Sequence, residues 1–268
     1  MNAPVQIVPV AAQKSIFGMP VYDMDWEMAL AFIADAVELP VGQVRVAFLN
    51  ANNANIMQAD KDYRAILAGQ VVLPDGFGVD LASWALNGSA FKANLNGTDL
   101  VPSLLTYLSR PMRIGLIGGR GDVVTITAEQ FRRHAPWHTF IPVSDGFLSE
   151  ENATEVADRM TTMDLDILLI GMGTPLQEKW TARYIRADHA RLVLGVGALF
   201  DFVSGRVTRA PQWVRRLRFE WAYRMISEPG RLWRRYIIGI PVFFFNVALY
   251  RLLGSARMSG GHRKLGSV

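Results

Sequence analysis

The sequence has 268 residues, of which 50% are hydrophobic and 19% are charged, so it can bury a sizeable core and is not expected to be disordered. It contains no cysteine, which excludes disulfides, cysteine-ligated zinc and a cysteine nucleophile. Residues 204–268 hold 13 Lys and Arg against 2 acidic residues, whereas the rest of the chain is net acidic. A basic region of this kind can bind nucleic acid or anionic lipid, and its apolar content must decide between the two.

Short apolar runs alternate along the chain with stretches of helical periodicity. The predicted strands are Val44–Asn50, Val71–Leu73, Met112–Ile117, Thr139–Val143, Leu165–Gly171 and Arg191–Val196. The predicted helices are Ala51–Asp60, Val79–Leu86, Asp122–His134, a stretch that Ser149 caps and that runs to Met160, and Pro175–Ala187. This alternation predicts an α/β fold with a doubly wound, Rossmann-like parallel sheet.

The domain division follows charge and composition. The start of the chain lacks a basic segment followed by a long apolar run, so we expect residues 1–14 to form a flexible leader rather than a secretory signal. The change of charge near Gly205, with Pro211 close behind, indicates a boundary. We therefore expect an α/β domain at 15–205, a C-terminal appendage at 206–254 and a flexible tail at 255–268.

In sheets of this type, ligands bind at the carboxyl ends of the strands. Residues that follow predicted strands should meet there, and these are Asn50, Asp75, Gly118, Gly171 and Gly197. The Gly118–Gly121 turn can cradle phosphates through its backbone N–H groups, or it is an ordinary turn between strand and helix.

Asp75 lies in a Pro-Asp-Gly turn, where aspartate either serves the turn itself or acts as the general base that a sugar transferase needs. Asn50, Asn52, Asn53 and Asn55 form an amide cluster, which either caps a helix or binds sugar hydroxyls. The four histidines form no metal-ligand pattern, and we identified no Asp-x-Asp triplet of the kind that metal-dependent transferases use. We therefore expect neither a metal nor another cofactor.

The run Tyr236–Tyr250 has no charged residue and lies between Arg235 and Arg251. Fifteen helical residues span only about 22 Å, less than the roughly 30 Å hydrocarbon core of a bilayer. The run also contains Pro241 and Asn246. We therefore expect a basic, amphipathic or hairpin-like segment that targets a membrane surface, with a core helix as the alternative.

Several longer motifs occur together in a fixed order: Pro74–Gly78, Asn96–Leu100, Gly171–Trp180 (GMGTPLQEKW), Gly195–Phe202 with Arg209–Pro211, and Glu220–Leu232. In these motifs, and over roughly residues 15–250, the chain resembles the WecG/TagA/CpsF glycosyltransferase family. The resemblance implies an inverting, metal-independent transferase that uses UDP-sugars and builds lipid-linked polysaccharide precursors.

By this resemblance, Asp75 matches the proposed base, and Asn50 and Asn52 match a Thr-x-Asn pair whose threonine is replaced here. Asn94 stands where the family usually has an arginine, and Phe147 stands where a tyrosine would stack on uracil. The residues expected to bind the substrate or UDP are Gly76, Gly118, Gly119, Phe147, Gly171, Gly173, Gln177, Glu178, Gly197, Asp201, Arg224, Arg231 and Arg234.

The function that we predict is transfer of a hexose or N-acetylhexosamine from a UDP-sugar to a polyprenyl-diphosphate-linked sugar in exopolysaccharide synthesis. The alternatives are a UDP-N-acetylmannosamine transferase of wall or antigen synthesis, and a basic nucleic-acid-binding protein. The expected partners are the UDP-sugar donor, the lipid-linked acceptor and the anionic inner face of the cytoplasmic membrane, with no nucleic acid. The sequence leaves open whether the protein forms a homo-oligomer.

Overall fold

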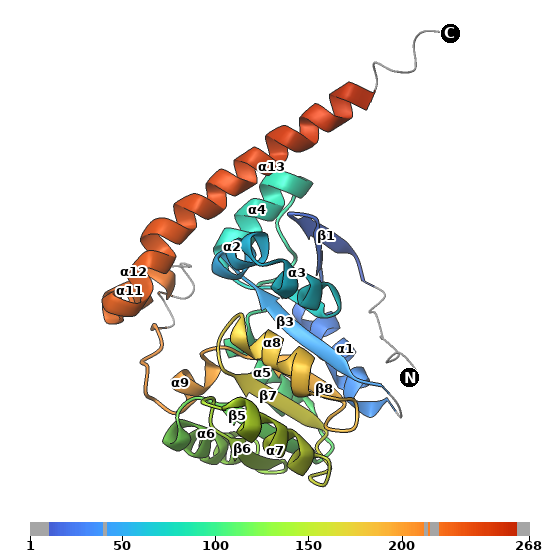
Figure 1. Cartoon of the computed structure of the whole chain (residues 1–268), viewed down its shortest axis with the longest axis vertical. Helices are drawn as coiled ribbons and strands as arrows, with labels where there is room; N and C mark the ends of the chain where they lie inside the picture. Colours follow the sequence, from blue (N-terminus) through green and yellow to red (C-terminus); the bar gives the residue numbers. More distant parts are fainter. Residues whose placement is uncertain (1–10, 40–41, 212–213, 215–219, 262–268) are drawn as a thin grey trace.

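A six-stranded parallel sheet forms the centre of the computed structural model, with strand order β4-β3-β8-β7-β5-β6 (Figure 1). The structure describes residues 11–39, 42–211, 214 and 220–261, except for the side chains of 231 and 254–261. The strands are β3 (Val44–Leu49), β4 (Val71–Pro74), β5 (Arg113–Gly118), β6 (Thr139–Ser144), β7 (Ile167–Gly171) and β8 (Leu192–Gly195). All neighbouring strands pair in parallel, which confirms the predicted sheet.

Helices cover both faces of this sheet. Successive side chains of a strand point to opposite faces, so an apolar strand has side chains to bury on both of them. Ile114 and Leu116 of β5 face one core, whereas Ile117 faces another. The helices on the first face are α1 (Trp26–Glu38), α5 (Gly97–Tyr107), α6 (Gly121–His134) and α9 (Leu199–Val203). Those on the second face are α2 (Ala51–Ala59), α3 (Lys61–Ala68), α4 (Phe77–Asn87), α7 (Glu150–Met160) and α8 (Leu176–Tyr184). The doubly wound arrangement is thus confirmed, and the predicted cap of α7 is present, because Ser149 Oγ accepts from the Asn152 N–H.

An antiparallel hairpin precedes the sheet and was not predicted. It comprises β1 (Gln13–Ile16) and β2 (Met19–Tyr22). Lys14 forms an ion pair with Asp23 at 3.0 Å. The hairpin thus begins within the stretch that we expected to be a flexible leader, of which residues 1–10 lie outside the described part of the chain.

The C-terminal region consists of α11 (Glu220–Ser227), α12 (Pro229–Trp233), the π-helical turn η1 (Arg234–Ile238) and the long helix α13 (Gly239–Gly261). The first half of α13 packs against α2 and α4 (Figure 1). Phe243 and Val247 are buried there, and the Phe17 ring of the hairpin lies 5.7 Å from the rings of both Phe243 and Tyr250. This half of α13 is therefore part of the globular body, and the helix continues past residue 254, where we expected the appendage to end.

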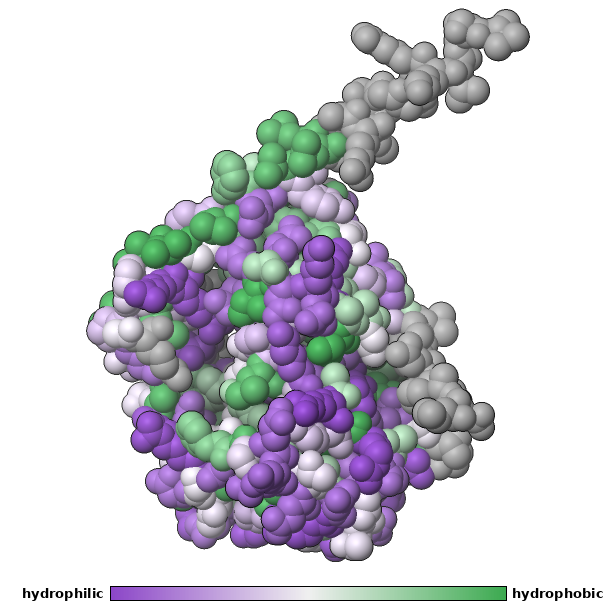
Figure 2. Space-filling view, viewed as in Figure 1, coloured by the Kyte–Doolittle hydropathy of each residue, from purple (hydrophilic) through white to green (hydrophobic). Residues whose placement is uncertain are grey.

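The other side of α13 is exposed and also apolar, as Figure 2 shows along the helix. An amphipathic helix would present polar residues on that side, so the amphipathic character that we expected is not confirmed. The length that we expected for the apolar helix was also too short, because the helix continues beyond Arg251. Residues Arg234–Leu253 are long and apolar enough to cross a membrane, judged by length and composition alone. Among the side chains of α13 that the structure describes, the large exposed apolar ones are those of Val242, Phe245, Leu249, Tyr250, Leu252 and Leu253.

Candidate active site

Asn50 and Asp75 follow two neighbouring strands, and the register that pairs Leu49 with Pro74 brings them together. The side-chain amide of Asn50 donates a hydrogen bond to Asp75 Oδ2 at 3.1 Å. At the same time Asn50 Oδ1 accepts from the Asn53 N–H at 3.0 Å and caps α2. Asn50 therefore caps α2, which is one of the two roles that its sequence context left open, and it also contacts Asp75. Its contact with a sugar hydroxyl stays a prediction.

Hydrogen bonds from two backbone N–H groups hold the turn that carries Asp75. The Asp75 N–H donates to the Leu49 carbonyl at 2.9 Å, and the Gly76 N–H donates to Asn94 Oδ1 at 2.8 Å. Gly76 has φ of +93°, a value that residues with side chains rarely adopt. Asn94, which stands where the family usually has an arginine, thus supports the turn that carries Asp75.

Asp75 is half-buried, and burial raises the pKa of its carboxyl group above the ordinary value. The hydrogen bond from Asn50 and the positive charges of Arg235 and Arg224 act in the opposite direction, whereas the charge of Asp99 raises the pKa further. A carboxylate with a raised pKa is a stronger base than an ordinary aspartate. Asp75 is therefore suited to accept a proton from a hydroxyl group.

The other asparagines of the cluster differ in their roles. Asn53 is buried and donates to the Phe48 carbonyl at 2.9 Å, so it serves the fold. Asn55 donates to the Gly239 carbonyl at 2.7 Å and fixes the start of α13. Asn52 is half-buried, and its amide lies 3.4 Å from Asn53 Oδ1. It remains a predicted substrate contact.

Residues that follow the last strand close over the Asp75 side of the sheet. Arg209 forms an ion pair with Asp99 at 2.7 Å, and its Nε lies 3.9 Å from Glu220 Oε1. Burial raises the pKa of Glu220, the charges of Arg209 and Arg224 oppose this rise, and the charge of Asp75 adds to it. The Glu220 and Arg224 side chains of α11 therefore lie within electrostatic reach of the predicted base.

The three predicted arginines are placed differently. Arg224 is half-buried, with its guanidinium 5.0 Å from the centre of the Phe202 ring, and its buried Nε has no hydrogen-bond partner among the described residues. Arg234 is exposed and lies 5.3 Å from the Trp233 ring, and the side chain of Arg231 lies outside the described part. Sequence reasoning did not single out Arg209, Glu220 or Arg235 as site residues. Arg235 follows Arg234, which was predicted, so the pair of adjacent arginines in the sequence could have indicated Arg235 as well.

The glycine-rich strand ends meet on the other half of the same edge. A Cβ at Gly118 would lie 2.4 Å from the Gly171 carbonyl oxygen, so only glycine permits this approach. The Gly119 N–H donates to the Gly171 carbonyl at 3.1 Å, and the Gly146 N–H donates to the Gly119 carbonyl at 2.8 Å. From here β5 leads to α6 on one face and β7 leads to α8 on the other, which makes this the crevice where doubly wound sheets bind ligands.

Gln177 connects two of these loops. Its Oε1 accepts from the N–H groups of Gly173 at 3.2 Å and Gly197 at 3.1 Å. Glu178 Oε1 accepts from the Gln177 amide and from the Thr174 hydroxyl, both at 2.9 Å. Gln177 and Glu178 are both buried, so their side chains hold the loops in place. The part of these loops that can face a ligand is then their backbone.

An aromatic side chain stands free beside this crevice. Phe147 is 72% exposed, and the neighbouring Gly146 contacts the Gly118–Gly119 backbone. Asp201 in α9 is half-buried, and Arg206 Nη1 lies 3.9 Å from its carboxylate. An exposed ring beside backbone N–H groups is an arrangement suited to a nucleotide.

The chain contains three Asp-x-Asp triplets, at Asp23–Asp25, Asp60–Asp62 and Asp164–Asp166, which corrects the expectation that it has none. Asp25 caps α1, Asp60 caps α3, and Asp166 pairs with Arg110 at the amino end of the sheet, so each triplet serves the fold. Among the described residues, no group of three or more His, Asp and Glu side chains could hold a metal ion.

Known proteins are similar in sequence to most of this chain. The sequence model of the glycosyl transferase WecG/TagA/CpsF family matches residues 14–257. A Bacillus spizizenii protein named N-acetylglucosaminyldiphosphoundecaprenol N-acetyl-β-D-mannosaminyltransferase is 31% identical over 80% of this chain and 83% of its own length. A Bacillus subtilis protein of the same name is 30% identical over 79% of this chain and 81% of its own length.

Proposed function

Because the chain belongs to the WecG/TagA/CpsF glycosyl transferase family, we propose that it transfers an N-acetyl-β-D-mannosaminyl group from UDP-N-acetylmannosamine to N-acetylglucosaminyl-diphosphoundecaprenol. Both named relatives match about four fifths of the chain, and their names state this sugar and this acceptor. The comparisons therefore favour the N-acetylmannosamine alternative over the hexosyl transfer in exopolysaccharide synthesis that the sequence led us to expect first.

The observation that carries the proposal is the Asn50–Asp75 pair at the carboxyl ends of β3 and β4. In an inverting reaction, Asp75 accepts the proton of the acceptor hydroxyl while the hydroxyl oxygen attacks the anomeric carbon of the donor sugar. The bond from that carbon to the diphosphate breaks, and UDP leaves with its electron pair. Because the pKa of Asp75 is raised, its carboxylate is a better acceptor for this proton than an ordinary aspartate.

The leaving diphosphate needs positive partners. Backbone N–H groups at the glycine-rich strand ends and the start of α6 supply partial positive charge. Arg224, whose buried Nε has no hydrogen-bond partner among the described residues, supplies a full positive charge close to Asp75. By family resemblance Arg231 and Arg234 are proposed to join it, although Arg234 stacks on Trp233 in this structure.

The uridine is proposed to lie at the opposite half of the same edge. Phe147 would stack on the base, and Asp201 would accept hydrogen bonds from the ribose hydroxyls. The strand order puts β8 and β7 between this half and Asp75. The donor would then lie across the strand ends with its sugar toward Asp75.

The test is transfer by the full-length protein, with the product identified by mass spectrometry. UDP-N-acetylmannosamine, UDP-N-acetylglucosamine and UDP-glucose are each offered with N-acetylglucosaminyl-diphosphoprenol, and only the first should give product. Asp75→Asn should lower turnover by about 10²–10⁴-fold while leaving UDP binding intact. Glu220→Gln is the matched control, since it changes another carboxyl group with a raised pKa in the same cluster. A preference for UDP-glucose would refute the donor, and near-normal turnover by Asp75→Asn would refute the base.

We further propose that the protein acts on the inner face of the cytoplasmic membrane. The basic C-terminal region supports this, because each cation near an anionic leaflet contributes about 1 kcal/mol. Extraction of membranes from cells that express the full chain should release the protein at alkaline pH. Retention after alkaline extraction would instead indicate that α13 is inserted across the bilayer.

A further inference from the structure

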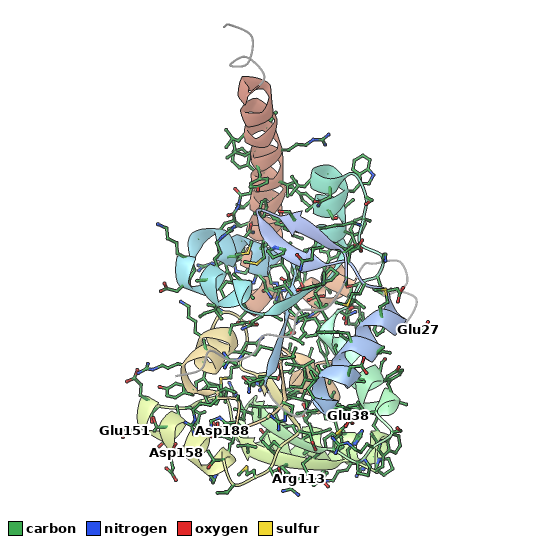
Figure 3. The ribbon with its side chains drawn as sticks, turned by 90° about the vertical axis from the view of Figure 1, so that its right-hand side faces the viewer. Glu27, Glu38, Arg113, Glu151, Asp158 and Asp188 are labelled. Atoms are coloured by element: carbon green, nitrogen blue, oxygen red, sulfur yellow. The ribbon has the colours of Figure 1, made fainter. Side chains whose placement is uncertain are left out.

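Glu178 is an acidic residue in the interior of the protein. It is 3% exposed, whereas Glu38, Glu151, Asp158 and Asp188 are exposed and lie on the outside of the molecule (Figure 3). A carboxyl group away from water has to be well hydrogen-bonded or neutral, because burying its charged form is costly. The hydrogen bonds of Glu178 therefore indicate what this residue does.

The two carboxyl oxygens of Glu178 have different surroundings. Oε1 accepts from the Gln177 side-chain amide and from the Thr174 hydroxyl, both at 2.9 Å. Oε2 is buried and has no hydrogen-bond partner among the described residues. Glu178 thus presents one fixed acceptor, Oε1, to the neighbouring glutamine.

The neutral form of Glu178 fits these surroundings. Burial raises the pKa of its carboxyl group, and the hydrogen bonds from Gln177 and Thr174 oppose this rise. A proton on this group belongs on Oε2, because Oε1 already faces two donors. Glu178 also lines a cavity of about 10 Å³, together with Arg45 and Thr181 among others, which has room for one water molecule beside the carboxyl group.

The acceptor on Glu178 determines which way round the Gln177 amide lies. Nε2 of Gln177 donates to Glu178, so its Oε1 lies on the other side, where it accepts from the N–H groups of Gly173 and Gly197. A reversed amide would set its own N–H groups against both backbone donors. Gly195 leaves the room for this side chain, since a Cβ there would lie 2.7 Å from Gln177 Nε2.

Gly173 and Gly197 lie in the middle of the ligand-binding edge. They follow β7 and β8, which the strand order places between the proposed uridine site at β5 and Asp75 after β4. Their φ values are +82° and +54°, and a Cβ on either residue would have no heavy atom within 4 Å. A ligand can therefore approach both backbones closely. In the proposed arrangement, this middle part faces the diphosphate and the sugar of the donor.

We propose that Glu178 is a positioning residue for the diphosphate and sugar of the donor: it holds the Gln177 amide in one orientation, and Gln177 holds the loops of Gly173 and Gly197 at a fixed separation. This inference rests on the proposed function, because it takes the donor to lie across the strand ends. In this role Glu178 acts from behind the loops and does not touch the donor itself.

The first test needs no ligand and measures hydrogen exchange of the Gly173 and Gly197 N–H groups by NMR in the full-length protein. Glu178→Leu removes the acceptor, so both groups should exchange about tenfold faster than in the parent. Glu178→Gln keeps an acceptor oxygen and puts N–H groups where the neutral carboxyl group has its O–H, so it should exchange like the parent. Unchanged exchange in Glu178→Leu would overturn the proposal.

The second test separates the KM of the donor from kcat. Glu178→Leu should raise the KM of the donor about tenfold and keep kcat and the KM of the acceptor within about threefold, because it disturbs binding rather than the proton transfer. Glu178→Gln should restore the donor KM. A KM in Glu178→Gln as high as in Glu178→Leu would show that a charged carboxylate is needed at this position. That result, or a loss of kcat with an unchanged donor KM, overturns the positioning role.

Gly195→Ala acts on the same amide from a neighbouring strand, and it keeps the test informative if Glu178→Leu fails to fold. The added Cβ should displace the Gln177 amide, so exchange at the two glycines and the donor KM should both rise. Parent-like values of both quantities in Gly195→Ala would show that the amide does not set the loops, and would contradict the proposal.

His138→Leu is the control for the loss of a buried polar side chain. His138 is 4% exposed, and its two ring nitrogens lie 3.1 and 2.9 Å from backbone groups. It precedes Thr139, which pairs with Arg113 at the end of the molecule away from α13 (Figure 3). This variant should lower the melting temperature and leave both the exchange of the two glycines and the donor KM unchanged. The same rise in donor KM in His138→Leu would assign the effect to general destabilisation and overturn the proposal.

The two proposals can fail separately, because hydrogen exchange requires neither donor nor acceptor. Exchange that responds as expected in a protein that transfers no N-acetylmannosamine would contradict only the proposed function. Transfer of this sugar together with unchanged exchange in Glu178→Leu would contradict only the role of Glu178.

Discussion

The amide of Asn50 lies 3.1 Å from Oδ2 of Asp75, so the residue that caps α2 also donates to the proposed base. A hydrogen bond to the charged form of a carboxyl group lowers its pKa, and here it partly offsets the rise caused by burial. The strength of the base is therefore set by a residue on the neighbouring strand end.

Asn50→Ala should move the acidic limb of the kcat/KM profile to higher pH. The variant loses the donor that favours the carboxylate, so the pKa of Asp75 rises further and the base is ionised only at higher pH. The measurement is the pH profile of transfer to a soluble acceptor. Asn50→Thr is the control for the cap, because threonine keeps an N-cap oxygen. An unchanged limb in Asn50→Ala would show that the hydrogen bond does not tune the base.

Phe147→Ala should weaken UDP binding about tenfold, because stacking of a base on an aromatic ring contributes about 1–3 kcal/mol. The ring is largely exposed, so the change should leave the melting temperature nearly constant. Titration calorimetry with UDP measures the effect, and Phe147→Tyr, which keeps a stacking face, should bind like the parent. Equal affinity for Phe147→Ala and the parent would place the uracil elsewhere.

Arg224→Ala should lower kcat about 10²-fold with a soluble acceptor, since it removes a charge that would stabilise the leaving diphosphate. Vesicle binding should hardly change, because the side chain is half-buried beside Phe202. Arg224→Lys should restore only part of the rate, as lysine cannot form the bidentate contact. Arg231→Ala and Arg234→Ala are predicted to lower turnover too. A loss of vesicle binding without a loss of kcat in these variants would assign the arginines to the membrane.

Phe243→Ala should destabilise the fold by about 3–5 kcal/mol, the cost of emptying a buried aromatic site. Phe245→Ala, two residues further along α13, removes an exposed ring and should change the free energy of unfolding by about 0.5 kcal/mol or less. Urea unfolding in detergent-free buffer compares the two. Equal stabilities would mean that α13 is not part of the cooperative unit.

Sequence patterns predicted the sheet well because its strands are short, continuous apolar runs that end at glycine, asparagine or aspartate. The rule that ligands bind at the carboxyl ends of parallel strands then placed Asn50, Asp75, Gly118 and Gly171 along one edge, and the strand order agrees. The β1–β2 hairpin escaped prediction because its strands, with the sequences QKSI and MPVY, form no continuous apolar run. Helix α5 carries Pro102, which masked its helical pattern.

The parts of the site that sequence reasoning missed depend on contacts between distant segments. Arg209 meets Asp99 across more than a hundred residues, and no periodicity encodes such a pair. Glu220 faces the same cluster from a separate helix. The prediction for α13 was wrong for a different reason. We took the helix to end with the uncharged run at Arg251, whereas it continues to Gly261.

The contact between Phe17 and Phe243 also sets an order of events during synthesis. The ribosome makes Phe17 more than two hundred residues before Phe243, and N-terminal elements fold first as the chain emerges. The hairpin, α2 and α4 are therefore synthesised before α13, and they form the surface on which its inner side packs. An α13 that packs on this surface as it emerges would not be available for insertion across a membrane.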